Sequence, residues 1–204
     1  LSRESVTEAV DVAYRTAKAS KRLVTKPVHL SEEKAEQARW NSKTRRSLQD
    51  VTIEEKLGVL EEIEKSLKPA VVKVNLPSRT LVLLDDVTDR YYANTEGARI
   101  HGSVSRVSLL FILTANEPGK GTIQRIGHRG ETGGWEQLEE WNAPALVSDE
   151  AASLGRILRE GKQAPREQLD LVLGPEVTGI VCHESCGHPQ EADRILGREA
   201  AQAG

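Results

Sequence analysis

The sequence predicts an α+β fold in which an antiparallel or mixed sheet is flanked by helices and is followed by a helix containing two histidines. Two observations support this fold class. Apolar residues recur at helical spacings of three and four near the start of the chain, after residue 52 and after residue 148. Between residues 71 and 129 they instead alternate every second residue, as in strands that have one buried face.

The first part of the chain predicts helices around a short extended segment. Apolar residues spaced for one helix face predict a helix over residues 3–20, and the β-branched run Arg22–Leu30 predicts a strand or extended segment. Ser31 is expected to cap a polar helix that reaches about Ser42. Thr52 and Glu55 form a capping box before the clearest helix, which Pro69 is expected to end.

The alternating part of the chain predicts an antiparallel meander from Val71 to about Arg129. Turn residues are expected to separate its strands at Pro77-Ser78, Asp85-Asp86, Glu96-Gly97 and Glu117-Pro118-Gly119. The expected strands are Val71 onward, Leu81–Leu84, Tyr91–Asn94, Ala98–His101, Ser103–Thr114 and Thr122–His128.

The last part of the chain is expected to mix a helix with two further strands. Gly130–Gly134 is predicted as a loop. Ser148 is then expected to cap a helix that directs Leu154, Ile157 and Leu158 to the core and ends at Gly161. Gln168–Leu173 and Val177–Cys182 are predicted strands, and the second runs into the histidine-containing segment.

The composition excludes several classes of protein. Of 204 residues, 38% are hydrophobic and 29% are charged, which is typical of soluble globular domains. The net charge of −3, with no dominant basic patch, argues against a nucleic-acid partner. The longest apolar stretch, Val107–Ala115, is too short to span a membrane, and no secretory signal begins the chain. We therefore expect a cytoplasmic protein.

The segment His183-Glu184-Ser185-Cys186-Gly187-His188 contains the residue types of a hydrolytic zinc site. Two imidazoles can bind the metal, and a neighbouring carboxylate can act as the general base on a metal-bound water. The histidines are five residues apart, roughly 140° around a regular helix. Both can reach one ion only if the helix is widened or broken there, and Gly187 and Pro189 are expected to favour such a distortion.

Several neighbouring residues allow more than one interpretation. Cys182 and Cys186 could complete a Cys2His2 zinc site, Cys186 could be a reactive thiol, or both could be small buried residues that pack the motif. Glu191 and Asp193 could hold a ligand imidazole through its second nitrogen, or form a solvated acidic turn, and Glu191 could be a direct ligand. Trp135 could line a peptide cleft or pack in the core.

Two blocks of the sequence resemble the TldD/PmbA family of metallopeptidases. The first is Gly179-Ile180-Val181-Cys182-His183-Glu184-Ser185-Cys186-Gly187-His188 followed by Glu191-Ala192-Asp193, and the second is Tyr91-Tyr92-Ala93-Asn94-Thr95-Glu96-Gly97. The order of the predicted elements also fits this family, so that the resemblance covers most of the chain.

The resemblance implies the roles of the motif residues. His183 and His188 would be ligands of a Zn2+ ion, and Glu184 would be the general base. The third ligand in the family is a cysteine from a C-terminal half that these 204 residues lack. Since the chain also lacks methionine and stops in a helix-rich region, we expect a fragment. It would comprise an N-terminal α+β domain over residues 1–173 and the start of the catalytic region over residues 174–204.

The resemblance also implies substrates and partners. The expected activity is zinc-dependent cleavage of unfolded or short peptides that bind in an extended conformation as an added strand. A TldD-type subunit carrying the metal would pair with a TldE/PmbA-type subunit, or form a homodimer, and the fragment alone would be inactive. Two alternatives stay open: a metal-free peptide-binding or regulatory subunit of the same family, and an unrelated α+β domain with a chance motif.

Overall fold

The computed structural model describes residues 2–25, 27 and 32–197, with the backbone alone for residues 69–73. The chain divides into two units, residues 1–160 and 161–204, and each is described by itself. In the first unit the helices are α1 (Arg3–Ser20), α2 (Ile53–Lys73), α3 (Glu136–Trp141) and α4 (Ala143–Glu160), and the strands are β1 (Gln37–Asn41), β2 (Asn75–Ala93), β3 (Arg99–Glu117) and β4 (Gly121–Thr132). The second unit contains α5 (Pro175–Cys182), a π-helical turn (His183–Gly187), a 3₁₀ turn (His188–Gln190) and α6 (Ala192–Ile195). The predicted α+β class is confirmed.

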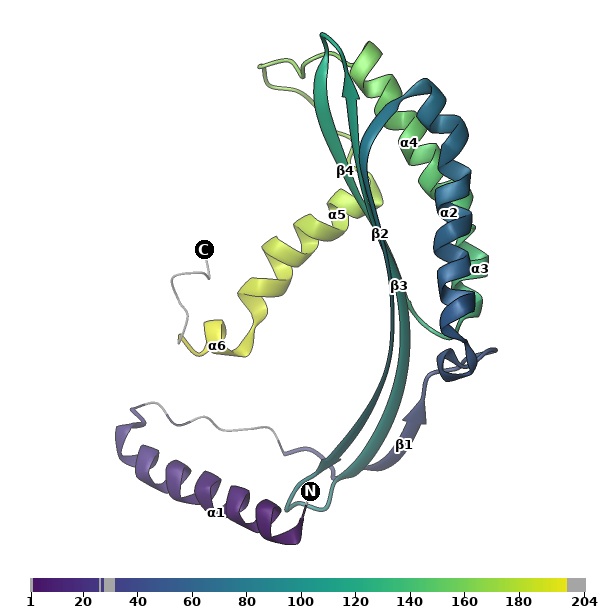
Figure 1. The fold of residues 1–204 in the computed structure, drawn as a ribbon. Helices are drawn as coiled ribbons and strands as arrows, with labels where there is room; N and C mark the ends of the chain where they lie inside the picture. The colour runs from purple at the N-terminus through teal and green to yellow at the C-terminus, as the bar shows by residue number, and fades with distance from the viewer. Residues whose placement is uncertain (1, 26, 28–31, 198–204) are drawn as a thin grey trace. The chain divides into compact units, whose positions relative to one another are not determined.

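β3 is the central strand of the sheet (Figure 1). It pairs with antiparallel β2 along its whole length, from Asn75 opposite Asn116 to Ala93 opposite Arg99. On its other side β1 pairs in parallel with residues 99–103, and β4 pairs antiparallel with residues 106–117. β1 and β4 therefore follow each other along one side of β3 and run in opposite directions.

Ser42 joins the sheet at the point where β1 gives way to β4. Its backbone N–H donates to the Ser103 carbonyl at 2.9 Å, and its hydroxyl oxygen accepts the Ser105 N–H at 2.9 Å. The Ser105 carbonyl in turn accepts the Gly133 N–H at 3.0 Å. The change of strand direction therefore leaves both backbone groups of Ser105 hydrogen-bonded.

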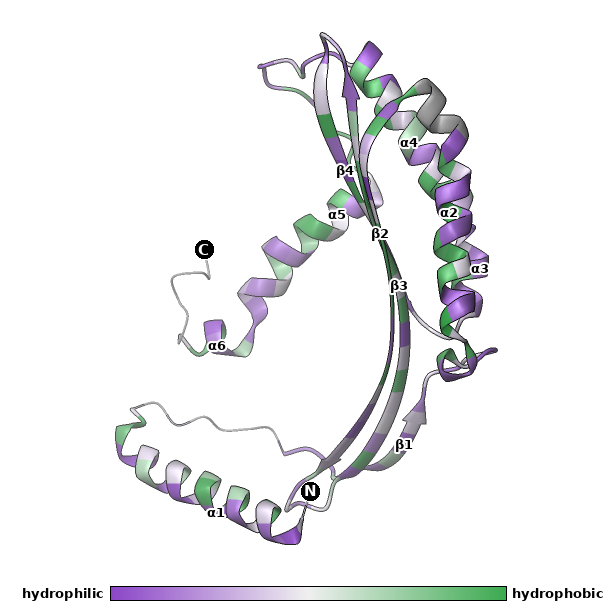
Figure 2. Cartoon of the chain, in the orientation of Figure 1, coloured by the Kyte–Doolittle hydropathy of each residue, from purple (hydrophilic) through white to green (hydrophobic). Residues whose placement is uncertain are grey.

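The core lies on one face of the sheet, against α2 and α4 (Figure 1). β3 carries many hydrophobic residues (Figure 2). Buried and partly buried residues alternate along it, and its odd-numbered residues from Val107 to Ala115 are at most 2% exposed. Burying each large side chain of this kind stabilises the fold by about 1.5–3 kcal/mol. Gly127 of β4 lies opposite Phe111, where a Cβ atom would meet the Phe111 ring at 2.1 Å. A residue without a side chain is therefore required there.

The strands are longer than the sequence predicts. The expected turns at Pro77-Ser78 and Asp85-Asp86 are wrong, because both pairs lie inside β2. Pro77 falls within a register irregularity between Asn75 and Ser78, where a missing N–H is tolerated, and the Asp85 carboxylate is held in the strand by Lys56 Nζ at 2.7 Å. The turns at Glu96-Gly97 and Glu117-Pro118-Gly119 are confirmed, with positive φ at Gly97 and Gly119.

Two predictions for the first part of the chain need correction. The helix of residues 3–20 is confirmed as α1, but it buries no residue. α2 continues past Pro69 to Lys73, so the strand predicted from Val71 is wrong: proline removes one backbone donor without forcing a helix to end.

Pairing with β3 overrides the helix expected over residues 31–42, since residues 37–41 form β1; its cap Ser31 lies outside the described residues. The predicted strand Arg22–Leu30 overlaps a 3₁₀ turn formed by residues 21–23. Its residues 26 and 28–30 are outside the described part.

The end of the first unit also differs from the prediction. β4 extends to Thr132, into the predicted loop Gly130–Gly134, and α3 was missed. α4 begins at Ala143, so Ser148 lies inside the helix and does not cap it. Leu154 and Leu158 are buried as predicted, whereas Ile157 is 46% exposed. The helix ends before Gly161, as expected.

Both strands predicted after α4 are wrong. Residues 168–173 form no strand in the structure, and Val177–Cys182 belongs to helix α5. Short apolar runs do not distinguish a strand from a helix. The residues that indicate a helix here are Gly174-Pro175, at the start of α5. Proline suits the first turn of a helix, because the N–H groups there have no partner within the helix. Among the described residues, no helix is long and apolar enough to cross a membrane.

Hydrogen bonds of a buried carboxylate connect α3 to the segment before α2. Glu136 is 7% exposed, and its oxygens accept the backbone N–H groups of Arg45 at 3.1 Å, Arg46 at 3.0 Å and Gly134 at 3.1 Å. Burial raises the pKa of this carboxyl, but the backbone donors together outweigh burial and lower the pKa to about 2. Gly134 is required because a Cβ atom would lie 2.1 Å from the Arg46 carbonyl oxygen.

We predict that Glu136→Gln lowers the free energy of unfolding at neutral pH by about 2–3 kcal/mol, because charge-assisted hydrogen bonds are lost and one backbone donor faces an amide NH2. Urea unfolding of the 204-residue chain measures this loss, with exposed Glu139→Gln in the same helix as the control. An equal, small effect of both substitutions would contradict the role of Glu136.

The Glu136 contribution should also depend on pH. Its folded-state pKa of about 2 is below the ordinary 4.5, so its stabilisation is complete above 4.5 and is lost as the pH falls towards 2. The difference corresponds to about 3 kcal/mol. Unfolding curves at a series of pH values should show this decline in the wild type and a smaller decline in Glu136→Gln. Parallel declines would disprove the prediction.

Candidate metal centre

Helix α5 leads directly into the histidine motif. Pro175 begins the helix after Gly174, and the regular turns end at Cys182. Val177, Ile180 and Val181 are 45–56% exposed, so α5 has an apolar surface that the described part of the second unit does not cover. The motif is therefore presented at the end of a helix, and not at the end of a strand.

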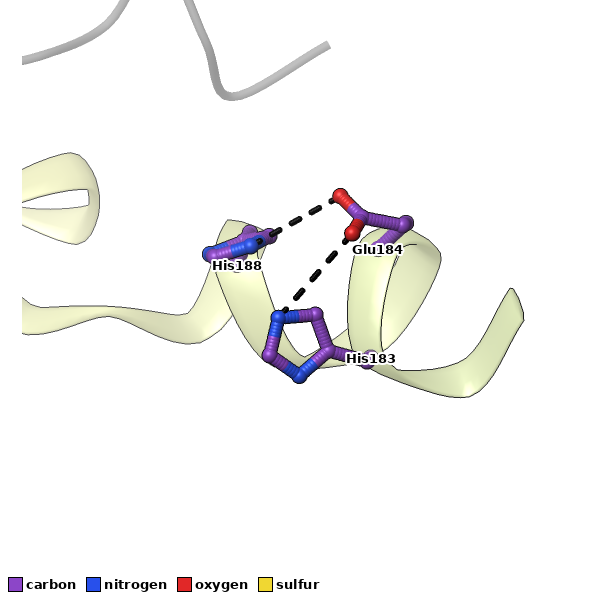
Figure 3. A group of neighbouring side chains, drawn as sticks. All are labelled: His183, Glu184 and His188. Carbon is purple, nitrogen blue, oxygen red and sulfur yellow. Dashed lines mark ion pairs between the residues drawn. The ribbon is translucent and has the colours of Figure 1, made fainter. Parts of the chain in front are cut away.

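A π-helical turn brings the two histidines to the same side. Residues His183–Gly187 form this turn, and the His188 N–H donates to the His183 carbonyl, so the hydrogen bond spans the five-residue spacing of the motif. The two imidazole rings lie 4.5 Å apart between centroids and are nearly perpendicular, at 84° (Figure 3). The predicted widening of the helix is confirmed.

Pro189 and Gly187, the two residues expected to favour the distortion, have different effects on the backbone. Pro189 has no N–H to continue the hydrogen bonding of the wide turn, and the helix ends in the 3₁₀ turn His188–Gln190. Gly187 has right-handed helical angles, φ −65° and ψ −59°, and a Cβ atom there would meet the Cys182 carbonyl oxygen at an ordinary 3.9 Å. Neither value requires glycine, so the conformation of Gly187 does not support the expectation that this residue eases the distortion.

The Glu184 carboxylate faces both imidazoles (Figure 3). One carboxylate oxygen is 4.0 Å from His183 Nε2, and the other is 3.6 Å from His188 Nε2. Within the described residues, these three side chains form a group whose ligand atoms lie within 4.8 Å of one another. Zinc holds imidazole nitrogens at about 2 Å, so small side-chain rotations would bring both nitrogens to one ion. The donor set and its spacing therefore fit a metal.

The two acidic residues after the motif contact different groups. Glu191 Oε1 lies 2.8 Å from His188 Nδ1, on the side of the ring away from Glu184. Asp193 Oδ1 instead accepts the backbone N–H of Arg194 at 2.8 Å. Sequence reasoning missed Arg194, whose Nε lies 3.3 Å from Glu191 Oε2. The sequence signal was weak: the i,i+3 spacing from Glu191 indicates a contact when both residues are in one helix, and Glu191 is extended.

The other candidate residues lie outside this group. Cys182 and Cys186 are both exposed, so the prediction that they are buried against the motif is wrong, and the metal-capable group in the described residues contains neither thiol. Trp135 is 4% exposed and belongs to a hydrophobic cluster of the first unit with Leu48, Val51, Val107 and Leu138. It packs in the core.

Comparisons with known proteins relate the chain to metallopeptidases. The sequence profile described as the PmbA/TldA metallopeptidase central domain matches residues 46–159, which excludes the interpretation that the chain is an unrelated domain. A protein of Methanocaldococcus jannaschii named metalloprotease is 26% identical over 200 residues, which cover 98% of this chain and 43% of that protein.

Two further proteins named metalloprotease are similar to the chain. The one from Methanothermobacter thermautotrophicus is 33% identical over 121 residues, covering 58% of this chain and 26% of its own length. The one from Archaeoglobus fulgidus is 27% identical over 170 residues, covering 81% of this chain and 36% of its own length. The chain thus spans less than half the length of each of these three relatives.

We predict that both thiols of the native 204-residue chain react with a small disulfide reagent, because both are exposed. Reaction should be fast, without unfolding, and each of the single variants Cys182→Ser and Cys186→Ser should lose half of the signal. A native chain whose thiols become reactive only in denaturant would show that the motif is covered.

Proposed function

This chain belongs to the PmbA/TldD family of metallopeptidases, and we propose that it supplies two zinc ligands, His183 and His188, and a general base, Glu184, for peptide hydrolysis. One observation carries the proposal: the π-helical turn brings one ring nitrogen of each histidine and one Glu184 carboxylate oxygen within 4.8 Å of one another. A regular helix with the same five-residue spacing would separate the imidazoles.

Zinc is the metal that the donor set favours. Imidazole nitrogens suit zinc, and hydrolytic zinc sites commonly combine histidines with one more ligand and an open position. When bound, zinc would activate a water molecule and polarise the substrate carbonyl. The names of the three relatives support a metal, without specifying which one.

Glu184 is suited to proton transfer. Its side chain is 63% exposed and reaches the Nε2 side of both imidazoles, so water and a peptide can approach it. We assign to its carboxylate the transfer of a proton from the attacking water to the leaving amine nitrogen, which commonly accelerates a reaction about 10²–10⁴-fold. His183 and His188 provide lone pairs and need not exchange protons.

We propose that a ligand from outside these 204 residues completes the site. Two histidines leave a third protein ligand to be supplied, and we propose the cysteine that the family resemblance implies. Unfolded or short peptides in an extended conformation are the proposed substrates, and a TldE/PmbA-type subunit or a second copy is the proposed partner. A metal-free peptide-binding subunit of the same family is the alternative that the metal measurements below would reveal.

Zinc content of the full-length protein tests the metal assignment. We expect about one zinc per chain in the wild type, and loss of most of it in His183→Ala and in His188→Ala. His128→Ala on β4 is the matched control and should retain the metal. A zinc-free wild type that cannot be loaded with zinc would overturn the proposal and support the metal-free alternative.

Glu184→Gln tests the general base separately from metal binding. This variant should retain zinc and lose peptide hydrolysis by about 10²–10⁴-fold, because the amide cannot accept the proton of the water. Exposed Glu167→Gln in the same unit is the control. Undiminished hydrolysis by Glu184→Gln would disprove the assignment.

The isolated 204-residue chain is expected to hydrolyse no peptide, since it supplies two imidazole ligands and lacks the third ligand. A peptide with a fluorescent leaving group, incubated with the chain and excess zinc, measures this. Hydrolysis that is abolished by a chelator and by His183→Ala would show instead that these residues suffice.

A further inference from the structure

We propose that Arg194 is a positioning residue that acts through Glu191 to hold His188 with its Nε2 atom directed at the metal. This inference rests on the proposed function of His188 as a ligand. It adds a residue that neither the motif spacing nor the family resemblance assigns.

The contacts form a chain of three side chains. Glu191 uses its two oxygens separately: Oε1 lies 2.8 Å from His188 Nδ1, and Oε2 lies 3.3 Å from Arg194 Nε. Because each oxygen has a partner, rotation of the carboxylate would break both contacts. The same arrangement argues against Glu191 as a direct metal ligand.

The backbone brings these residues together in two steps. The 3₁₀ turn after His188 places residues three apart on the same side, so that Glu191 lies beside the imidazole. Glu191 itself is extended, with ψ 139°, and precedes α6, whose first turn carries Arg194 back towards the carboxylate. The four-residue helix α6 therefore has a specific role, which is to present Arg194.

Burial supports the assignment. The Arg194 side chain is 8% exposed, whereas Glu191 is 44% and His188 is 31% exposed. In the same helix the apolar side chain of Ile195 is 68% exposed. Hydrophobic burial alone would favour the opposite order. A sheltered guanidinium beside a carboxylate restricts the positions that an exposed glutamate can adopt.

The consequence for His188 is a defined tautomer. An ionised carboxylate only accepts hydrogen bonds, so the contact with Glu191 favours the neutral tautomer that has its proton on Nδ1 and its lone pair on Nε2. The Nε2 atom lies on the Glu184 side, 3.6 Å from its carboxylate. Residues that orient a ligand histidine in this way commonly raise metal affinity about 10- to 100-fold.

The test compares zinc dissociation constants of the full-length protein, measured by competition with a chelating indicator. We expect Arg194→Leu and Glu191→Gln each to weaken binding by about 10-fold or more, and the double variant to be no weaker than Glu191→Gln alone, because Arg194 acts through Glu191. Arg166→Leu and Glu167→Gln, exposed in the same unit, are matched controls and should bind as the wild type does.

Two further measurements separate positioning from loss of structure. Ring ¹⁵N shifts of His188 in the zinc-free protein should report the Nδ1–H tautomer in the wild type and a mixture in Arg194→Leu. Arg194→Lys keeps the positive charge beside Glu191 but lacks the planar guanidinium. Both measurements should therefore give values between those of the wild type and Arg194→Leu.

Wild-type zinc affinity in Arg194→Leu, with the wild-type tautomer, would overturn this inference and leave the proposed function intact. Failure of the wild type to bind zinc would instead overturn the proposed function.

Discussion

One-sided burial of β3 is the constraint on which the rest of the first unit depends. Its odd-numbered residues from Val107 to Ala115 are almost completely buried against α2 and α4, while the intervening residues are partly exposed. A slip of one residue would exchange these faces, so burial fixes the register of β3 with its neighbours. That register brings Gly127 opposite Phe111, where only glycine fits.

Periodicity made part of this fold predictable. The many apolar residues of β3 and the apolar faces of α2 and α4 belong to the residues themselves, so the sequence shows them. β1 was not predictable, because residues 37–41 are all exposed and form a strand through hydrogen bonds to β3. At the site, the five-residue spacing predicted the widened turn, whereas Arg194 was missed because its position depends on the extended backbone of Glu191, which redirects the chain.

The second unit differs from the first in the interactions that hold its structure. In its described part, residues 161–197, no residue is fully buried. The geometry of the motif instead depends on local interactions: the backbone hydrogen bond from His188 to His183, and the side-chain contacts among His188, Glu191 and Arg194. Where a hydrophobic core is absent, ligation itself contributes to the ordering of a metal site. Metal binding and local stability should therefore be coupled in this unit.

The placement of β1 has a consequence for how the chain folds during synthesis. β2, β3 and β4 are consecutive and joined by short turns, so they can pair as soon as each is made. β1 pairs with a segment about sixty residues further along the chain, and closing so long a loop costs more entropy than closing a hairpin. β1 is therefore made well before its partner, and until it pairs, one side of residues 99–103 is open to other strands.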